Sequence, residues 1–139
     1  MFLLDTNVVS ELRKVRAGKA NQGVADWASS IPSGRMFVSS ITLHELELGV
    51  LLAERSDPSR GAILRSWLDG GVSVAFATRV LPVDERVARR SAALHVPDPA
   101  PLRDAFIGAT ALVHQMAVVT RNVRDFERFD ELDVVNPWG

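Results

Sequence analysis

The chain has 139 residues, of which 47% are apolar and 24% are charged, a balance that excludes a disordered protein. The absence of cysteine excludes disulfide bonds, thiolate zinc sites and cysteine nucleophiles. A net charge of −1 provides no overall attraction to nucleic acid, so any binding of phosphate groups has to come from a local patch of basic side chains.

The apolar segments are too short to cross a membrane, because none approaches the roughly 18 residues that a span requires. Asp5 interrupts the N-terminal apolar segment almost at once, and the basic region and cleavage site of a signal peptide are absent. We therefore expect a soluble, cytoplasmic protein without a membrane partner. No linker, repeat or low-complexity segment divides residues 1–139, which we expect to form a single domain.

The first element is expected to be a short buried strand, because residues 1–4 are apolar and Asp5 follows them directly. Asp5 would then lie at the carboxyl end of the strand, where ligand sites form in open parallel sheets. Asn7 is expected to cap a helix that runs through Leu12. A short helical turn and a second strand are expected next, over residues 24–28 and 36–39.

Two helices are expected in the middle of the chain. Thr42 and Glu45 have the spacing of a capping box, which predicts a helix over about residues 43–55. Pro58 suits the first position of the following helix, and Gly70 and Gly71 are expected to end that helix.

The last part of the chain alternates short apolar strands with helices. Asp84 is expected to cap a helix over residues 85–95, and the prolines between residues 97 and 101 exclude a helix there. The remaining expected elements are a long apolar helix over residues 102–115, strands over residues 80–83, 117–120 and 132–135, and a helical piece around residues 125–126. Buried strands that alternate with helices favour an α/β domain with a parallel sheet.

Four carboxylates stand out because they lie at strand ends or helix starts. They are Asp5, Glu45, Asp104 and Asp125. Each also has a purely structural explanation, as part of a turn, a capping box or a helix start. A parallel sheet, however, gathers such positions at one edge. Carboxylates gathered in a partly dry cleft repel one another unless a cation neutralises them, and Mg²⁺ and Mn²⁺ prefer oxygen ligands. A cluster of carboxylates without histidine or cysteine is typical of metal-assisted phosphoryl chemistry.

The segments around these acids resemble the motifs of PIN-domain ribonucleases of the VapC type, the toxin half of a bacterial toxin–antitoxin pair. They occur in the order of the family and cover nearly the whole chain. The segments are Leu3–Asn7, Ser40–Gly49, Asp104–Ala111 and Thr120–Phe126. The resemblance implies a PIN-like three-layer sandwich, in which a central, mostly parallel sheet has helices on both faces.

The same resemblance implies a metal-dependent endoribonuclease. Its acidic pocket binds Mg²⁺ or Mn²⁺ and is implied to consist of Asp5, Glu45, Asp104 and Asp125. Thr6 and Asn122 are implied to lie beside the pocket, where they support the metal site or position phosphate. Family members usually form homodimers and are inhibited by an antitoxin that inserts a peptide near the pocket. A cognate antitoxin and an RNA substrate are therefore the expected partners.

Two positions depart from the family pattern or leave a role open. Asp98, in the proline-rich segment, is a rival of Asp104 but lacks an apolar helix behind it. Asp125 is the fourth acid, which can act through water or contact the metal only with substrate bound.

Competing functions fit the residues less well. Phosphotransfer of the haloacid-dehalogenase kind needs a second aspartate two residues after the first, where this chain has Asn7. The zinc-protease pattern that begins at His44 needs a second histidine where the chain has Leu48. A non-catalytic, RNA-binding or regulatory PIN-like module stays open as the alternative function, although such modules typically lose one or more of the pocket acids.

Overall fold

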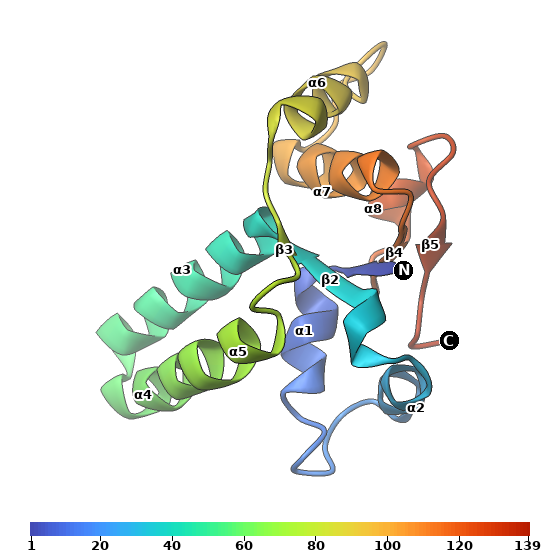
Figure 1. The fold of residues 1–139 in the computed structure, drawn as a ribbon. Coiled ribbons are helices and arrows are strands. Elements are labelled where there is room, and N and C mark those ends of the chain that lie inside the picture. The colour runs from blue at the N-terminus through green and yellow to red at the C-terminus, as the bar shows by residue number, and fades with distance from the viewer.

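The computed structural model describes all 139 residues and has a five-stranded parallel sheet at its centre (Figure 1). The strand order across the sheet is β3-β2-β1-β4-β5, so the N-terminal strand is the central one. The strands are β1 (Phe2–Leu4), β2 (Met36–Ser39), β3 (Val80–Leu81), β4 (Ala117–Val119) and β5 (Val134–Val135). In register, Phe2 of β1 lies between Met36 of β2 and Ala117 of β4.

Helices connect the strands and cover both faces of the sheet (Figure 1). On the way to β3 the chain forms α1 (Thr6–Leu12), α2 (Gln22–Ser30), the short 3-10 turn η1 (Ser33–Arg35), α3 (Ser40–Ser56), α4 (Pro58–Trp67), the wide helical turn η2 (Leu68–Val72) and α5 (Ser73–Ala75). After β3 come α6 (Glu85–Ala93), α7 (Leu102–Val113) and α8 (Arg124–Glu127). The structure contains no helix of the length and apolar character that a membrane crossing would need.

The two faces of the sheet support two separate apolar cores. Successive residues of a strand point to opposite faces. Leu4 accordingly packs with α1, α3 and η2, whereas its neighbour Leu3 packs with α7 and α8. In β4, Val119 and Val118 divide in the same way. The predicted α/β fold, a parallel sheet with helices on both faces, is therefore confirmed.

The cap of the first helix differs from the sequence prediction. Asp5, not Asn7, is the N-cap of α1, and its Oδ1 accepts a hydrogen bond from the backbone N–H of Thr6 at 2.7 Å. Asn7 lies inside the helix, where its Oδ1 accepts from the backbone N–H of Arg121 at 3.3 Å. The strand ends one residue before Asp5, so the helix begins immediately and leaves no turn for Asn7 to cap.

Two other helix boundaries were predicted wrongly. α3 begins at Ser40, directly after β2, with Ser39 as its cap, so Thr42 and Glu45 do not form a capping box. Gly70 and Gly71 do not end the helical path, which continues through η2 into α5. Apolar side chains on this segment explain the continuation, since Leu68 and Val72 are buried in the core beside the glycines.

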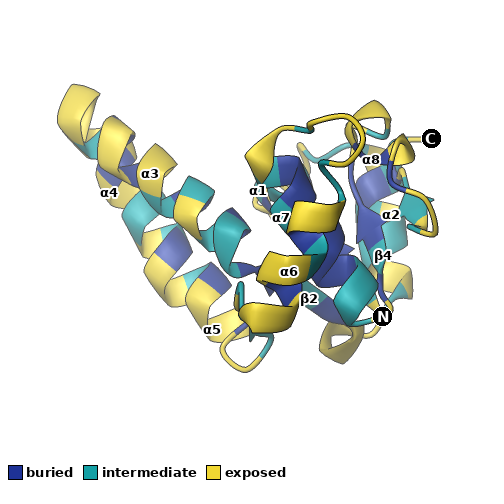
Figure 2. Cartoon of the chain, turned by 90° about the horizontal axis from the view of Figure 1, so that it is seen from above, coloured by how far each residue is buried: buried dark blue, intermediate teal, exposed yellow.

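Helices α3 and α4 form an antiparallel arm that extends away from the sheet (Figures 1 and 2). Arg65 on α4 ties the two helices together, because its guanidinium donates to Glu47 at 2.6 and 2.9 Å and to Glu54 at 3.0 and 3.3 Å. Much of the outer surface of the arm is exposed, as Figure 2 shows. The arm therefore depends on close contact between two helices more than on the central core.

Candidate active site

The site forms at the carboxyl edge of the sheet, where the chain order reverses. From β1 the sheet grows toward β2 and β3 on one side and later toward β4 and β5 on the other. Such a switch point leaves a crevice beyond the strand ends. Asp5 directly follows β1 and Thr120 directly follows β4, so both side chains lie at the base of this crevice.

Asp5 is fully buried and held in a fixed orientation. Its Oδ2 accepts a hydrogen bond from the Thr120 hydroxyl at 2.7 Å, while its Oδ1 caps α1. The Thr120 hydroxyl in turn accepts from the backbone N–H of Asn122 at 3.0 Å. A buried carboxylate needs such partners, because an unpaired buried charge is very unfavourable. Asn122 thus supports the site through its backbone, and its side chain is exposed.

Glu45 comes from the second turn of α3 and points to the same crevice. Its Oε1 accepts a hydrogen bond from the Thr6 hydroxyl at 2.6 Å. Glu47, two residues later, points to the other side and binds Arg65 of α4. The two glutamates of α3 therefore serve different contacts, and Thr6 lies beside the pocket acid Glu45.

Asp104, in the first turn of α7, completes a group of three carboxylates around one guanidinium. Arg103, the residue before it, donates to Asp104 Oδ1 at 2.9 Å through Nη1 and to Glu45 Oε2 at 2.7 Å through Nε. Its Nη2 donates to Asp5 Oδ1 and lies 3.4 Å from the Thr6 hydroxyl. Three acids that are far apart in the sequence thus converge on a single cation of the chain itself.

Asp125 and Asp98 lie outside this group. Asp125 is an exposed residue of α8, and its side chain makes no hydrogen bond or ion pair with the three acids. Asp98 is also exposed, and its backbone carbonyl accepts from Arg128 at 2.8 Å. Of the two rival aspartates, Asp104 is the one that contacts the group.

The electrostatics of the three-acid group differ from one carboxylate to the next. Burial raises the pKa of Asp104 above its ordinary value, and the nearby charges of Asp125 and Asp5 act in the same direction, against the opposing effect of Arg103. Burial also tends to raise the pKa of Glu45, but hydrogen bonds from Arg103 and Thr6 outweigh it, and that pKa is lowered. The pKa values of Asp104 and Glu45 are thus shifted in opposite directions although both carboxylates contact Arg103.

The donor set fits a hard divalent cation. The ligands offered are carboxylate oxygens with threonine hydroxyls beside them, which suits Mg²⁺ or Mn²⁺ better than a softer metal. As the side chains lie, no three acidic or histidine side chains are arranged to hold one metal ion. The reason is visible in the contacts, since one oxygen of each acid is directed at the Arg103 guanidinium.

Sequence reasoning did not single out Arg103 or Thr120. Arg103 stands immediately before Asp104 at a helix start. No pattern along the chain indicates that the Arg103 side chain points into the pocket. Along the chain, Thr120 is the end of an expected strand and the first residue of the fourth motif, but neither position assigns it a role in the pocket. The pairing of β1 with β4 brings it beside Asp5, so the sheet order is the signal that would have found it.

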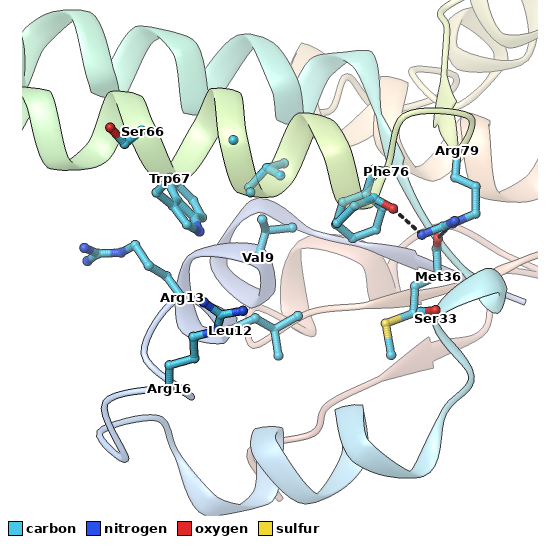
Figure 3. Close-up of a pocket in the computed structure, with 14 residues that line it drawn as sticks. Val9, Leu12, Arg13, Arg16, Ser33, Met36, Ser66, Trp67, Phe76 and Arg79 are labelled. Carbon is cyan, nitrogen blue, oxygen red and sulfur yellow. Dashed lines mark hydrogen bonds between the residues drawn. The ribbon is translucent and has the colours of Figure 1, made fainter.

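Two grooves flank the first helix. The larger, of about 880 Å³, lies between α1 and the segment from α4 to α5, with Trp67 and Phe76 on its wall and Arg13, Arg16 and Arg79 around it (Figure 3). The second, of about 520 Å³, begins at Thr6 and Glu45 and runs between α1 and the α3–α4 arm; basic side chains along it are Arg13, Lys14 and Arg60. The second groove therefore connects the acidic pocket with positive charge.

An acidic pocket at the switch point of a small parallel sheet places the chain among the α/β folds whose ligand sites form beyond the strand ends. Residues 2–132 match the family model described as PIN domain, and the chain belongs to this family. It is 36% identical over 143 residues to "VapC ribonuclease Y4jK" from Sinorhizobium fredii, with 99% of this chain and 98% of that protein covered.

Solved structures agree with this assignment. The fold is similar to the crystal structure of FitAcB from Neisseria gonorrhoeae, with a TM-score of 0.88, 34% identity and 99% of each chain covered. It is also similar to a chain of a toxin–antitoxin complex from Klebsiella pneumoniae, with a TM-score of 0.68, 26% identity, and 99% of this chain and 98% of that one covered. The PIN-like fold that the motifs predict is therefore confirmed.

Proposed function

We propose that the protein is a metal-dependent endoribonuclease and the toxin of a bacterial toxin–antitoxin pair. The observation that carries the proposal is the convergence of Asp5, Glu45 and Asp104 at the carboxyl end of the central strand. Similarity over almost the full length to a protein named as a VapC ribonuclease supports the same activity. We further propose that residues 1–139 form one domain and that it acts in the cytoplasm, where RNA is present.

The three carboxylates would hold Mg²⁺ or Mn²⁺, and Asp125 would contribute from the rim of the pocket. When bound, such a cation makes a water molecule more acidic and stabilises charge on a phosphate group. The hydroxyls of Thr6 and Thr120 fix the orientation of Glu45 and Asp5 through the hydrogen bonds described above. These two hydrogen bonds hold one oxygen of Glu45 and one of Asp5 in place without substrate.

The second groove is proposed as the path of the RNA. It starts at Glu45 and continues past Arg13, Lys14 and Arg60, whose positive charges suit phosphate groups of the strand that leads away from the cleaved bond. A net charge of −1 makes this local patch necessary, because the protein as a whole does not attract RNA.

The larger groove is proposed as the binding site of the antitoxin. Trp67 and Phe76 offer apolar surface, and the arginines around them suit acidic residues on a partner peptide (Figure 3). The structural similarity to a chain of a toxin–antitoxin complex supports such a partner. We also propose a homodimer, supported by exposed apolar side chains on the α3–α4 arm, Leu51, Leu52 and Ile63 among them.

The direct test is cleavage of total RNA by the purified protein, free of antitoxin, with Mg²⁺ or Mn²⁺. The variant Asp5→Asn keeps the shape and the helix-capping ability of the side chain but removes its charge. Asp98→Asn is the matched control, because Asp98 is an exposed aspartate outside the three-acid group. Circular dichroism of each variant shows whether the fold is intact.

Discrete cuts by the wild type and by Asp98→Asn, lost in EDTA and in Asp5→Asn, are the expected result. Equal cutting by Asp5→Asn would show that the proposed site is not the source of the activity. Binding of RNA without cleavage under either metal would favour the non-catalytic RNA-binding module instead.

A further inference from the structure

The guanidinium of Arg103 sits at the mouth of the acidic pocket. Its side chain is 31% exposed, whereas the side chains of Asp5 and Asp104 beneath it are 0% and 7% exposed. All of its polar contacts are with the three pocket carboxylates and the Thr6 hydroxyl. No residue outside the pocket holds the guanidinium in this position.

A metal ion would need the oxygens that Arg103 already engages. One oxygen of each acid accepts from the guanidinium: Asp5 Oδ1, Glu45 Oε2 and Asp104 Oδ1. A divalent cation bound between these oxygens would stand at the centre of the same group, against a positive charge a few Å away. Like charges at such distances repel strongly in a partly buried site. The two cations therefore exclude each other.

The charges of the group favour exchange of one cation for the other. Three carboxylates carry three negative charges, of which the single guanidinium neutralises one. A divalent cation compensates more of this charge and presents no bulky planar group to the pocket. The Arg103 side chain is partly exposed, and its flexible aliphatic stem allows the guanidinium to leave without disturbing α7.

We infer that Arg103 is a built-in competitor of the catalytic cation, which holds the pocket acids together without metal and has to be displaced before metal binds. This inference rests on the proposed function, because it concerns the same acidic site. It explains how three close carboxylates are stable in a free chain, and it makes the metal affinity of the protein lower than its acids alone would give.

The test measures binding of Mn²⁺ alone to the purified full chain by isothermal titration calorimetry. Arg103→Met keeps a long side chain but removes the charge. Arg121→Ala is the matched control, because Arg121 lies next to the site on the β4 side but makes no contact with the pocket acids. Asp5→Asn shows whether the Mn²⁺ that binds is bound at the acidic pocket.

Arg103→Met is expected to bind Mn²⁺ about tenfold more tightly than the wild type, within the roughly 5–150-fold range usual for coupled ligands. Arg121→Ala is expected to stay near the wild-type affinity. Melting temperatures give a second readout. Without metal, Arg103→Met should melt below the wild type, because its carboxylates lack a counter-charge, and Mn²⁺ should raise its melting temperature more than that of the wild type.

Equal or weaker binding of Mn²⁺ by Arg103→Met, with binding still lost in Asp5→Asn, would overturn the competition but leave the proposed metal site intact. Binding that persists in Asp5→Asn, or no binding by any variant, would overturn the proposed metal site and the competition together. The two failures are therefore distinguishable in one set of titrations.

Discussion

Gly61 is the residue at which the α3–α4 arm is most sensitive to a single added atom. A Cβ at this position would lie 2.5 Å from Glu54 Cα and 2.6 Å from Glu54 N, both of them backbone atoms of α3. The substitution Gly61→Ala therefore forces the two helices apart. Overpacking of this kind costs about 3 kcal/mol when backbone must move, and the better helix propensity of alanine returns about 1 kcal/mol. The expected net loss is about 2 kcal/mol.

Gly49→Ala is the matched control, because it makes the same change in the middle of α3 on the partner helix. Gly49 is exposed, and a Cβ there would meet nothing within 4 Å. The helix-propensity gain then acts alone and is expected to stabilise the protein by up to about 1 kcal/mol. Gly61→Ala and Gly49→Ala are thus expected to change the free energy of unfolding in opposite directions, with a difference of about 3 kcal/mol between the two variants.

Urea denaturation at a fixed protein concentration measures both variants, because a dimer would make the midpoint depend on concentration. With a slope of about 2 kcal/mol per molar, Gly61→Ala should lower the midpoint by about 1 M, and Gly49→Ala should raise it by about 0.5 M. Midpoints that shift in the same direction for both variants, or a stabilised Gly61→Ala, would refute the close packing of α3 on α4.

Three further outcomes are expected. Thr120→Val leaves Asp5 Oδ2 without its 2.7 Å hydrogen bond in a buried position, and the free energy of unfolding should fall by about 1.5–3 kcal/mol; an unchanged urea midpoint would contradict this. The pKa of Glu11 is lowered, chiefly by its hydrogen bond from the backbone N–H of Asn21, so its contribution is present above the unfolded pKa and is lost as the pH falls through the folded one. The wild type should therefore be more stable than Glu11→Gln at pH 7 and lose that advantage as the pH falls below 4.5, the ordinary pKa of a glutamate. A stability difference between the two proteins that grows on acidification would refute this role of Glu11. Asp125→Asn should weaken Mn²⁺ binding less than Asp104→Asn, because Asp125 is exposed and outside the three-acid group; equal losses in calorimetry would make Asp125 a full ligand.

The strands and the sheet class were predictable because they follow from local patterns. β2 has the predicted bounds, and the predictions around Pro58 and Asp84 were correct, since a proline at a helix start and a capping carboxylate act within one turn. The helix boundary at Gly70 and Gly71 failed because burial of neighbouring apolar side chains outweighed the local preference of glycine.

The candidate site was predictable in part. Asp5, Glu45 and Asp104 come together as the motifs indicate, because Asp5 follows β1 directly and the other two lie within the first two turns of α3 and α7. The roles of Arg103 and Thr120 depend on which strands are neighbours and on which way a side chain turns at a helix start. Strand neighbours and side-chain directions are not local properties, so a pattern along the chain does not predict these two roles. The contribution of Asp125 stays a prediction.

The central place of β1 also determines when during synthesis the pocket can exist. The ribosome releases this strand well before its neighbour β4 and the acid on α7, which follow about 100 residues later. Contacts between such distant segments form late, after the costly closure of a long intervening loop. A nascent or truncated chain that lacks residues beyond about 100 therefore has Asp5 but no pocket around it, and under the proposed function it cannot attack the message from which it is being translated.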